Sequence, residues 1–272
     1  MADVAIVTGA ARGIGRAIAT RLTVEGWHVV LGDLDADLLT DVAAEIGAVA
    51  VPGDTSTEAG IRALVDAAAE YYGAVDVFFA NAGIGVLKGL ETSDDEWARV
   101  IDVNVMAHVR AARVLVPQWL ERGGGRLVVT ASAAGLLTML GDAPYAVTKH
   151  AAVAFAEWLS ATYRHRGIVV QALCPQGVDT RMLEQAGPLH EMLVRDGALS
   201  AETVADAVWQ ALQGEQLLIL PHPEVHEYHA FRASRPDDWV IGMNKLQQRL
   251  EHPTATPTQP TSSSTPTPQE HV

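Results

Sequence analysis

Short apolar runs rich in β-branched residues alternate along the chain with longer segments whose apolar residues recur every three or four positions. The short runs are nearly continuous in apolar residues, as strands buried on both faces must be, and the longer segments have the period of amphipathic helices. This alternation predicts an α/β fold, a single doubly wound parallel sheet of about seven strands with helices on both faces (a Rossmann fold). The predicted strands are Val4–Thr8, His28–Gly32, Ala48–Val51, Val75–Ala80, Arg126–Ala131, Ile168–Leu173 and Leu217–Leu220. Helices are expected to begin near Gly13, Asp35, Thr57, Asp94, Tyr145 and Ala201, with Ser56 and Ser200 as caps of two of them.

The chain has 272 residues, which suits either two domains or one large α/β domain with an appendage. We predict one dinucleotide-binding catalytic domain over residues 1–252. Within it, residues 180–200 mix apolar and charged residues around glycines, which predicts short helices that act as a substrate lid, and residues 224–250 form one amphipathic C-terminal helix. Residues 253–272 consist mainly of Pro, Thr, Ser and Gln and are predicted to be a disordered tail.

The charge balance excludes two classes of partner. Nineteen Lys and Arg against 33 Asp and Glu give a net charge of −14, and no basic cluster offsets it, so we expect neither nucleic-acid binding nor a membrane-binding patch. A small-molecule partner is expected instead. The single cysteine, Cys174, the lack of a secretory signal pattern after Met1 and the lack of a long apolar stretch predict a cytoplasmic protein without a transmembrane helix.

A glycine-rich turn joins the first predicted strand to the first predicted helix. It reads Thr8-Gly9-Ala10-Ala11-Arg12-Gly13-Ile14-Gly15. A strand, a glycine turn and a helix start together let the backbone approach a pyrophosphate closely. The spacing, Gly-x3-Gly-x-Gly, departs from the commoner Gly-x-Gly-x-x-Gly, so taken alone the turn is either a phosphate site or an ordinary connection.

Asp33 and Arg12 bear on which dinucleotide binds. Asp33 ends the second strand, about 20 residues past the glycines, where a carboxylate accepts hydrogen bonds from a ribose and repels a 2′-phosphate. Its alternative role is to open the next turn, although Asp35 is better placed as a cap. Arg12 has three possible positions. If it contacts a 2′-phosphate it favours NADP; otherwise it lies on the pyrophosphate or in solvent. The sequence predicts NAD, with NADP as the alternative.

Tyr145 and Lys149 lie four residues apart in a predicted helix, so both side chains project from one face. A nearby ammonium favours the phenolate and is expected to lower the pKa of the tyrosine. Ser132 follows the fifth strand, at the edge of the sheet where ligands gather, and its hydroxyl can orient a substrate oxygen. Each feature alone has an ordinary explanation, a solvated helix face for the pair and a strand-end turn for Ser132.

Together these motifs indicate a known protein family. From Ala2 to about Leu220 the chain resembles the short-chain dehydrogenases/reductases of the compact NAD type: TGAARGIG matches their cofactor turn, Asn81-Ala82-Gly83 their NAG motif, and Ser132 with Tyr145-x3-Lys149 their catalytic set. The resemblance implies catalytic roles for Asn104, Ser132, Tyr145 and Lys149, with Asn104 holding a water of the proton relay. It also implies cofactor-binding roles, among them Asp54 at the adenine, for Gly9, Arg12, Gly13, Ile14, Gly15, Asp33, Asp54, Asn81, Ala82, Gly83, Tyr145, Lys149, Pro175, Gly177, Val178 and Thr180.

One position departs from the family pattern. Gln176 stands between Pro175 and Gly177, where members usually have Pro-Gly, and it either touches substrate or points to solvent. Leucines and methionines flank the predicted pocket and indicate an apolar, medium-sized substrate. The predicted substrate-binding residues are Ser132, Tyr145, Gln176, Leu137, Met139, Met182 and Leu183, with Leu136 beside them.

The remaining candidates are weaker. His222, His226 and His229 lie close enough in sequence to suggest a metal site, but the order does not match His-Glu-x-x-His, and we predict an amphipathic helix and no metal. Cys174 is expected to be buried rather than reactive. Trp119, Trp158 and Trp209 are expected to bury surface within the chain or between subunits.

The sequence therefore predicts an NAD-dependent enzyme that interconverts a secondary alcohol and a ketone. Two alternatives stay open: an NADPH-dependent carbonyl reductase, and a nicotinamide-nucleotide-binding protein without turnover. By the same resemblance we expect a homo-oligomer, a tetramer or dimer, joined by the helices that begin near Asp94 and Tyr145.

Overall fold

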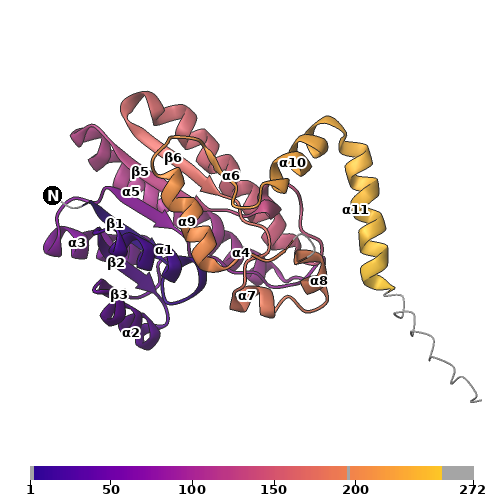
Figure 1. The fold of residues 1–272 in the computed structure, drawn as a ribbon, viewed down its shortest axis with the longest axis horizontal. Helices are drawn as coiled ribbons and strands as arrows, with labels where there is room; N and C mark the ends of the chain where they lie inside the picture. The colour runs from indigo at the N-terminus through magenta and orange to yellow at the C-terminus, as the bar shows by residue number, and fades with distance from the viewer. Residues whose placement is uncertain (1–2, 195–196, 253–272) are drawn as a thin grey trace, which may run out of the picture.

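The computed structural model describes residues 3–194 and 197–252 and contains one parallel sheet covered by helices on both faces (Figure 1). The strand order is β3-β2-β1-β4-β5-β6-β7, with every neighbouring pair parallel. The order reverses between β1 and β4, so the crevice at their carboxyl ends is the place where such sheets bind ligands. The strands are β1 Val4–Thr8, β2 His28–Asp33, β3 Val49–Pro52, β4 Val77–Ala80, β5 Gly125–Thr130, β6 Ile168–Leu173 and β7 Leu218–Ile219.

The helices agree with the predicted positions over most of the chain. The α-helices are α1 Gly13–Val24, α2 Ala36–Ile46, α3 Glu58–Tyr71, α4 Asp94–Ile101, α5 Ala107–Arg122, α6 Ala143–Tyr163, α7 Arg181–Glu184, α8 His190–Leu193, α9 Ala201–Ala211, α10 Glu224–Ser234 and α11 Pro236–Glu251. A π-helical stretch, Asp102–Met106, joins α4 to α5, and short 3₁₀ turns lie at Ala133–Gly135, Arg164–Arg166 and Gly187–Leu189. Among the described residues, no helix is long and apolar enough to cross a membrane.

Two apolar clusters, one on each face of the sheet, hold the layers together. Successive residues of β1 alternate between them: Ile6 packs on the face of α3, α5 and α6, whereas Val7 packs on the face of α1, α2 and α9. This is the period of two that places neighbouring side chains on opposite faces of a strand. Burial on both faces explains why the central strands read as continuous apolar runs in the sequence.

Two sequence predictions were wrong in detail. The cap of α3 is Thr57, whose side chain accepts from the Gly60 amide, whereas Ser56 donates its amide and hydroxyl to Asp54. The C-terminal segment is two helices, because Arg235, at φ −138° and ψ 62°, leaves the helical region immediately before Pro236. Proline lacks an amide donor and disfavours helical geometry in the residue before it.

Other predictions were confirmed or lie outside the described residues. Ser200 caps α9, Cys174 is fully buried, and residues 180–200 contain the expected short helices. Trp119 is buried, but Trp158 is 56% exposed on α6 and buries little surface within the chain. The predicted tail, 253–272, lies outside the described residues.

Candidate active site

The turn after β1 has no room for side chains at its glycines. Gly9 and Gly13 have φ values of +64° and +54°, which other residues adopt only with strain. A Cβ at Gly15 would lie 2.2 Å from the Gly9 carbonyl oxygen, and one at Gly9 would lie 2.9 Å from the Cα of Ala82. The turn is therefore closed tightly on itself and against the segment after β4. Ile14, between the last two glycines, packs partly buried against the core beneath.

Thr8 and Asn81 fix the turn against β4 and β5. The Thr8 hydroxyl accepts from the amides of Asn81 (2.9 Å) and Ala82 (3.1 Å), and the Asn81 side chain donates to the Thr8 carbonyl (2.9 Å). The Thr130 hydroxyl in turn donates to Asn81 Oδ1 (3.0 Å). The Asn81 carboxamide is thus occupied in bracing three strand ends. Thr8, which sequence reasoning did not single out, is 3% exposed and central to this arrangement.

Asp33 and Arg12 lie at the same edge but have different partners. Asp33 accepts from the amides of Ala11 (3.0 Å) and Asp35 (3.1 Å), so its half-buried carboxylate is fixed between the glycine turn and the start of α2. Arg12 forms an ion pair with Asp35, which also caps α2. The guanidinium is therefore neutralised by a carboxylate instead of being free for a 2′-phosphate.

These observations test whether a nicotinamide dinucleotide fits. A glycine cradle that a Cβ would fill, a helix N-terminus beyond it, and a fixed carboxylate at the end of β2 are the features that a pyrophosphate and an adenosine ribose require. The residues present fit the group. Asp54, predicted at the adenine, is exposed, and its Oδ1 accepts from the Ser56 amide and hydroxyl.

The loop after β6 closes the other side of this crevice. Val178 is buried and forms an isolated bridge with Leu199, and a Cβ at Gly13 would lie 3.3 Å from the Thr180 side chain. Pro175 accepts from the Ala133 amide (2.8 Å), which ties this loop to the segment that carries Ser132. Of the predicted positions in this loop, Thr180 therefore lies beside the glycine turn, whereas Pro175 contacts the segment of Ser132 and Val178 contacts Leu199.

His222 supports the same loop and is not free for a metal. Its Nδ1 accepts from the Gln176 amide (3.1 Å), and its Nε2 lies 3.1 Å from the Gly177 carbonyl oxygen. The imidazole is 2% exposed. His229, by contrast, contacts the Leu136 carbonyl from α10 (3.3 Å). Among the described residues, no three His, Cys, Asp or Glu side chains gather as metal ligands would.

Ser132, Tyr145 and Lys149 come together at the carboxyl edge of β5. Lys149 lies one helical turn after Tyr145 on α6, and its Nζ is 5.4 Å from the tyrosine ring centroid. The Lys149 ammonium donates to the Thr130 carbonyl (2.8 Å), and the Ser132 side chain hydrogen-bonds the phenol. Of the three residues, Ser132 lines a cavity that opens beside this edge of the sheet.

The pKa values of this pair differ from the sequence expectation. Burial raises the pKa of the Tyr145 phenol above its ordinary value, and the hydrogen bond with Ser132 opposes that rise only in part. Burial also lowers the pKa of Lys149 to about 8. The prediction that spacing alone gives a depressed tyrosine pKa was wrong for the free protein, because desolvation penalises phenolate and ammonium alike.

The lowered pKa of Lys149 predicts a pH-dependent stability. Since its pKa is about 8 in the folded protein against 10.5 as the ordinary value, the unfolded chain binds more protons between these pH values and wild-type stability should rise across that window. Lys149→Met removes the buried amine, so its free energy of unfolding should exceed that of wild type at pH 7. This difference should shrink by about 3 kcal/mol between pH 7 and pH 10.5, at about 1.4 kcal/mol per pKa unit. Urea unfolding at several pH values measures this difference. Lys245→Met, at an exposed position on α11, serves as the control, and a pH-independent difference for Lys149→Met would contradict the assignment.

Asn104 lies fully buried in the π-helical stretch between α4 and α5. Its Oδ1 accepts from the Ile84 amide (2.9 Å), and its Nδ2 donates to the Ile84 carbonyl (2.8 Å) and to the Thr148 hydroxyl (3.1 Å). A Cβ at Gly83 would lie 3.2 Å from Lys149 Nζ and 3.4 Å from Asn104 Oδ1, so these groups are neighbours. The Asn104 side chain thus positions the segment after β4 against α6, and π-helical turns are frequent at functional sites.

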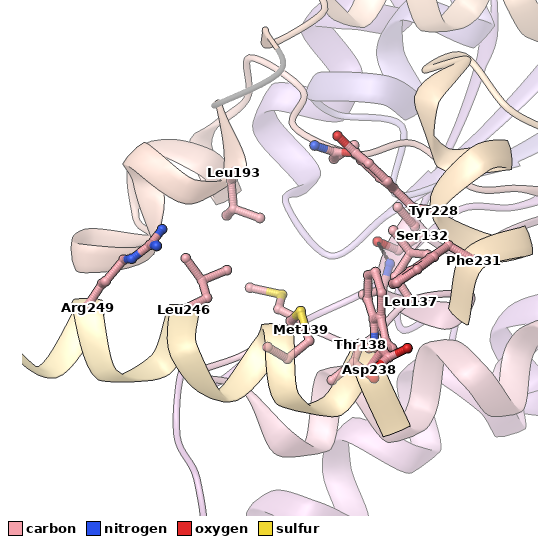
Figure 2. A pocket seen from close by; sticks show the side chains of 16 residues that line it. Ser132, Leu137, Thr138, Met139, Leu193, Tyr228, Phe231, Asp238, Leu246 and Arg249 are labelled. Atoms are coloured by element: carbon pink, nitrogen blue, oxygen red, sulfur yellow. Dashed lines mark hydrogen bonds between the residues drawn. The ribbon is translucent and has the colours of Figure 1, made fainter. Parts of the chain in front are cut away.

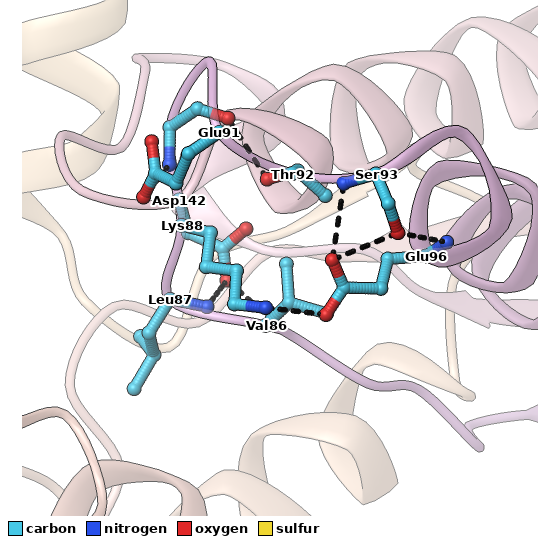
Figure 3. Close-up of polar contacts among 9 residues, drawn as sticks. Val86, Leu87, Lys88, Glu91, Thr92, Ser93, Glu96 and Asp142 are labelled. Carbon is cyan, nitrogen blue, oxygen red and sulfur yellow. Dashed lines mark hydrogen bonds and ion pairs between the residues drawn. The ribbon is translucent and has the colours of Figure 1, made fainter.

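Asp142 is a site residue that sequence reasoning missed. It is 1% exposed and caps α6: its Oδ1 accepts from the Tyr145 amide (3.0 Å), while its Oδ2 accepts from the amides of Val86 (2.9 Å) and Leu87 (2.8 Å). Figure 3 shows this carboxylate beside the loop that leads to the Ser93 capping box of α4. One buried side chain therefore sets both the start of the helix that carries Tyr145 and the loop facing it.

Removing this carboxylate should cost stability and activity together. We expect Asp142→Ala to lower the free energy of unfolding by about 3 kcal/mol, because it removes a helix cap and leaves three partly buried amides without this acceptor. Displacement of Tyr145 should also lower kcat. Ser93→Ala removes an exposed cap and should cost only about 1 kcal/mol with kcat unchanged. Urea unfolding and steady-state rates on both variants measure this, and equal effects would contradict the dual role.

A cavity of about 410 Å³ lies between the sheet edge and the C-terminal helices (Figure 2). Its wall is mainly apolar, and at one end it includes Ser132. The lining residues are Ser132, Ala133, Ala134, Leu137, Thr138, Met139, Gln176, Leu193, Tyr228, Phe231, Asp238, Trp239, Gly242, Met243, Leu246 and Arg249. Of the residues predicted for substrate, Ser132, Leu137, Met139 and Gln176 are therefore brought together here.

Tyr145, Met182 and Leu183, the other residues predicted to contact substrate, do not line this cavity. Met182 and Leu183 lie on α7, a single turn in which neighbouring residues point in different directions: Met182 is 47% exposed and Leu183 is 7% exposed. Helices α10 and α11 supply the far wall instead. The break at Pro236 lets α11 turn back beside the loop after β5, and the Leu136 carbonyl accepts from Arg232 on α10 (2.6 Å), which anchors the pair.

Comparison with known proteins agrees with this geometry. The family model described as short chain dehydrogenase matches residues 3–189. The chain is 38% identical over 229 residues to a 1-deoxy-11-beta-hydroxypentalenate dehydrogenase of Streptomyces exfoliatus, covering 81% of this chain and 83% of the relative. It is 35% identical to a 2-dehydro-3-deoxy-L-rhamnonate dehydrogenase (NAD(+)) of Sphingomonas, covering 66% and 74%. A solved short chain dehydrogenase/reductase of Burkholderia phymatum in complex with NAD superposes with a TM-score of 0.80 at 31% identity, covering 96% of this chain and 98% of that one.

Proposed function

The chain belongs to the short-chain dehydrogenase/reductase family, and from this premise we propose that it interconverts an apolar secondary alcohol and the matching ketone with NAD as its cofactor. The observation that carries the proposal is the convergence of Ser132, Tyr145 and Lys149 at the carboxyl edge of β5, where Ser132 lines the apolar cavity. Membership also makes the protein an oxidoreductase of alcohols and ketones, so the alternative of a binding protein without turnover loses its support.

We propose the following roles for the chain's own groups. The glycine turn and Asp33 would hold NAD, which when bound accepts or supplies a hydride. Ser132 donates a hydrogen bond to the reacting oxygen, and Tyr145 exchanges a proton with it. Lys149, fixed on the Thr130 carbonyl, places a positive charge near the phenol and stabilises its anionic form during the transfer.

The raised pKa of Tyr145 means that the free enzyme carries a protonated phenol at neutral pH. The phenol is protonated there and is ready to donate a proton to a ketone oxygen, whereas alcohol oxidation requires the phenolate. We therefore expect the oxidation rate to rise with pH.

The walls contributed by α10 and α11, with Leu193 from the predicted 180–200 lid, would keep water away from the reacting carbon.

A substrate panel tests the proposal. Purified protein with NAD and a series of apolar secondary alcohols should produce reduced nicotinamide, detected by its absorbance, and small polar alcohols should be poorer substrates because they leave the apolar wall in water. NADH binding without turnover of any alcohol or ketone would contradict the proposal and favour a binding protein.

The cofactor preference has its own prediction. Asp33→Ser removes the carboxylate that would accept from the ribose and repel a 2′-phosphate, and should lower the preference for NADH over NADPH at least tenfold. Initial rates with both cofactors measure the ratio. Asp37→Ser, on the outside of α2, serves as the matched control and should not change it. A wild-type preference for NADPH would contradict our interpretation of Asp33.

We also propose a homo-oligomer formed through α5 and α6. A largely apolar groove runs between these helices, lined in part by Val116, Leu120 and Phe155, and Trp158 stands 56% exposed beside it. A second copy of the chain would bury this face, as the family resemblance implies. Light scattering should show a dimer or tetramer that Trp158→Glu weakens, and a wild-type monomer would contradict the proposal.

A cytoplasmic location stays a prediction. The cysteine Cys174 is free and buried, with burial raising the pKa of its thiol to about 12, so it is neither bonded to another cysteine nor readily ionised. Such a thiol is compatible with the reducing compartment that holds the nicotinamide cofactors. Fractionation of the cells that make the protein would test it.

A further inference from the structure

The inner face of α11 carries an apolar stripe that ends in a charge. The α11 residues that line the cavity are Asp238, Trp239, Gly242, Met243, Leu246 and Arg249, spaced three to four apart after the first pair. This spacing places them on one face of the helix. If α11 only packed against the rest of the protein, the position of Arg249 would be expected to be apolar.

The two charged residues of this wall differ in their surroundings. Asp238 is paired with Arg235, the residue immediately before α11 (2.7 Å). Arg249 forms no ion pair or hydrogen bond with any other residue in 3–194 and 197–252, although the chain as a whole carries an excess of acidic residues. A cation at the end of an apolar cavity, without a partner in this part of the chain, attracts an anionic group of whatever enters the cavity.

The positions of Ser132 and Arg249 set the orientation of such a molecule. Figure 2 shows Ser132 beside Tyr228, Phe231 and Leu137 at one end, and Arg249 at the opposite end past Leu246. Arg249 lies eleven positions after Asp238, which corresponds to about 16 Å along a helix axis. Asp238, close to Thr138, would repel an anion at the end where Ser132 lies.

We propose that the substrate is an apolar alcohol or ketone with a carboxylate remote from the reacting carbon, and that Arg249 binds this carboxylate. The inference rests on the proposed function, since Ser132 and Tyr145 define the end at which the carbinol lies. The apolar middle of the molecule lies along Leu137, Met139 and Leu246. The guanidinium presents two parallel N–H donors to the carboxylate, whereas an ester or an alcohol at that end offers no charge.

Binding to the NADH-loaded protein tests the proposal without knowledge of the natural substrate. The probes are dodecanoate and methyl dodecanoate, which share one apolar chain, and affinity is followed by calorimetry. Dodecanoate should bind at least tenfold more tightly than its ester to wild type. Arg249→Gln should abolish this preference, and Arg249→Lys should retain part of it. Lys245→Gln removes an exposed cation one turn away, outside the cavity wall, and should leave the preference unchanged.

The possible outcomes separate this inference from the proposed function. Equal affinity for acid and ester, a preference that survives Arg249→Gln, or no binding of dodecanoate to NADH-loaded protein would overturn the assignment of Arg249. Tighter binding of dodecyl phosphate than of dodecanoate would overturn the choice of a carboxylate. Failure of the protein to bind NADH in the loading step would instead contradict the proposed function.

Discussion

Replacing Tyr145 with phenylalanine is expected to lower kcat for alcohol oxidation and ketone reduction by about a thousandfold, with NADH affinity within about threefold of wild type. The substitution removes one oxygen atom from the group that exchanges the substrate proton and leaves the ring against which Lys149 packs. Phenylalanine keeps the ring and nearly the same volume, so the variant should remain folded. Steady-state rates and a titration of protein intrinsic fluorescence with NADH measure the two quantities.

Tyr163→Phe supplies the matched control for this experiment. Tyr163 ends the same helix, far along the chain from Ser132, where its ring lies edge-on to Trp158. Its kcat should equal that of wild type. Turnover that survives in Tyr145→Phe would refute the proton-transfer role, and loss of NADH binding together with turnover would show that the residue supports the cofactor site rather than the chemistry.

Gly15→Val should abolish detectable NADH binding, with at least a hundredfold loss of affinity. Its Cβ would lie 2.2 Å from the Gly9 carbonyl oxygen and 2.6 Å from Asn81 Nδ2, and neither backbone nor the braced asparagine can yield without opening the turn. The thermal midpoint should fall as well, since overpacking in a closed site is costly.

The control for the glycine substitution lies on α11. Gly242→Ala adds a Cβ that meets nothing within 4 Å, at a helical position where alanine is favoured by about 1 kcal/mol. NADH affinity should be unchanged and the protein slightly more stable. An unaltered NADH affinity in Gly15→Val would mean that the glycine turn is not the phosphate site.

The sheet and the cofactor turn could be predicted from the sequence because their physical requirements are local. Strands buried on both faces must be apolar throughout, and β1 and β6 have the predicted bounds residue for residue. A turn closed on its own carbonyl requires glycine, so Gly9 and Gly15 mark it without knowledge of the rest of the fold.

The cavity wall could not be predicted in the same way. The apolar spacing of α11 shows which face is buried but not what it packs against, and Pro236 decides that direction through one non-helical residue before it. Asp142 presents the same difficulty. Its position before α6 indicates a helix cap. Its hydrogen bonds with Val86 and Leu87 cannot be predicted in this way, because they join segments more than 50 residues apart.

The pKa of Tyr145 shows a third kind of limit. The Tyr-x3-Lys spacing gives the separation along a helix, and from that separation alone the ammonium should lower the tyrosine pKa. Burial depends on the layers packed around α6, and it raises the pKa of Tyr145 in the free protein. The residues of the site were therefore predictable, and the electrostatic balance among them was not.

Transfer of deuterium from NADH that carries deuterium at both positions of the reactive nicotinamide carbon tests the central claim most directly. With an apolar ketone that the wild-type protein reduces, we predict that the carbinol carbon of the product carries the deuterium, as mass spectrometry would show. A product alcohol without deuterium, or ketones of every kind left unreduced by protein that binds NADH, would contradict the account.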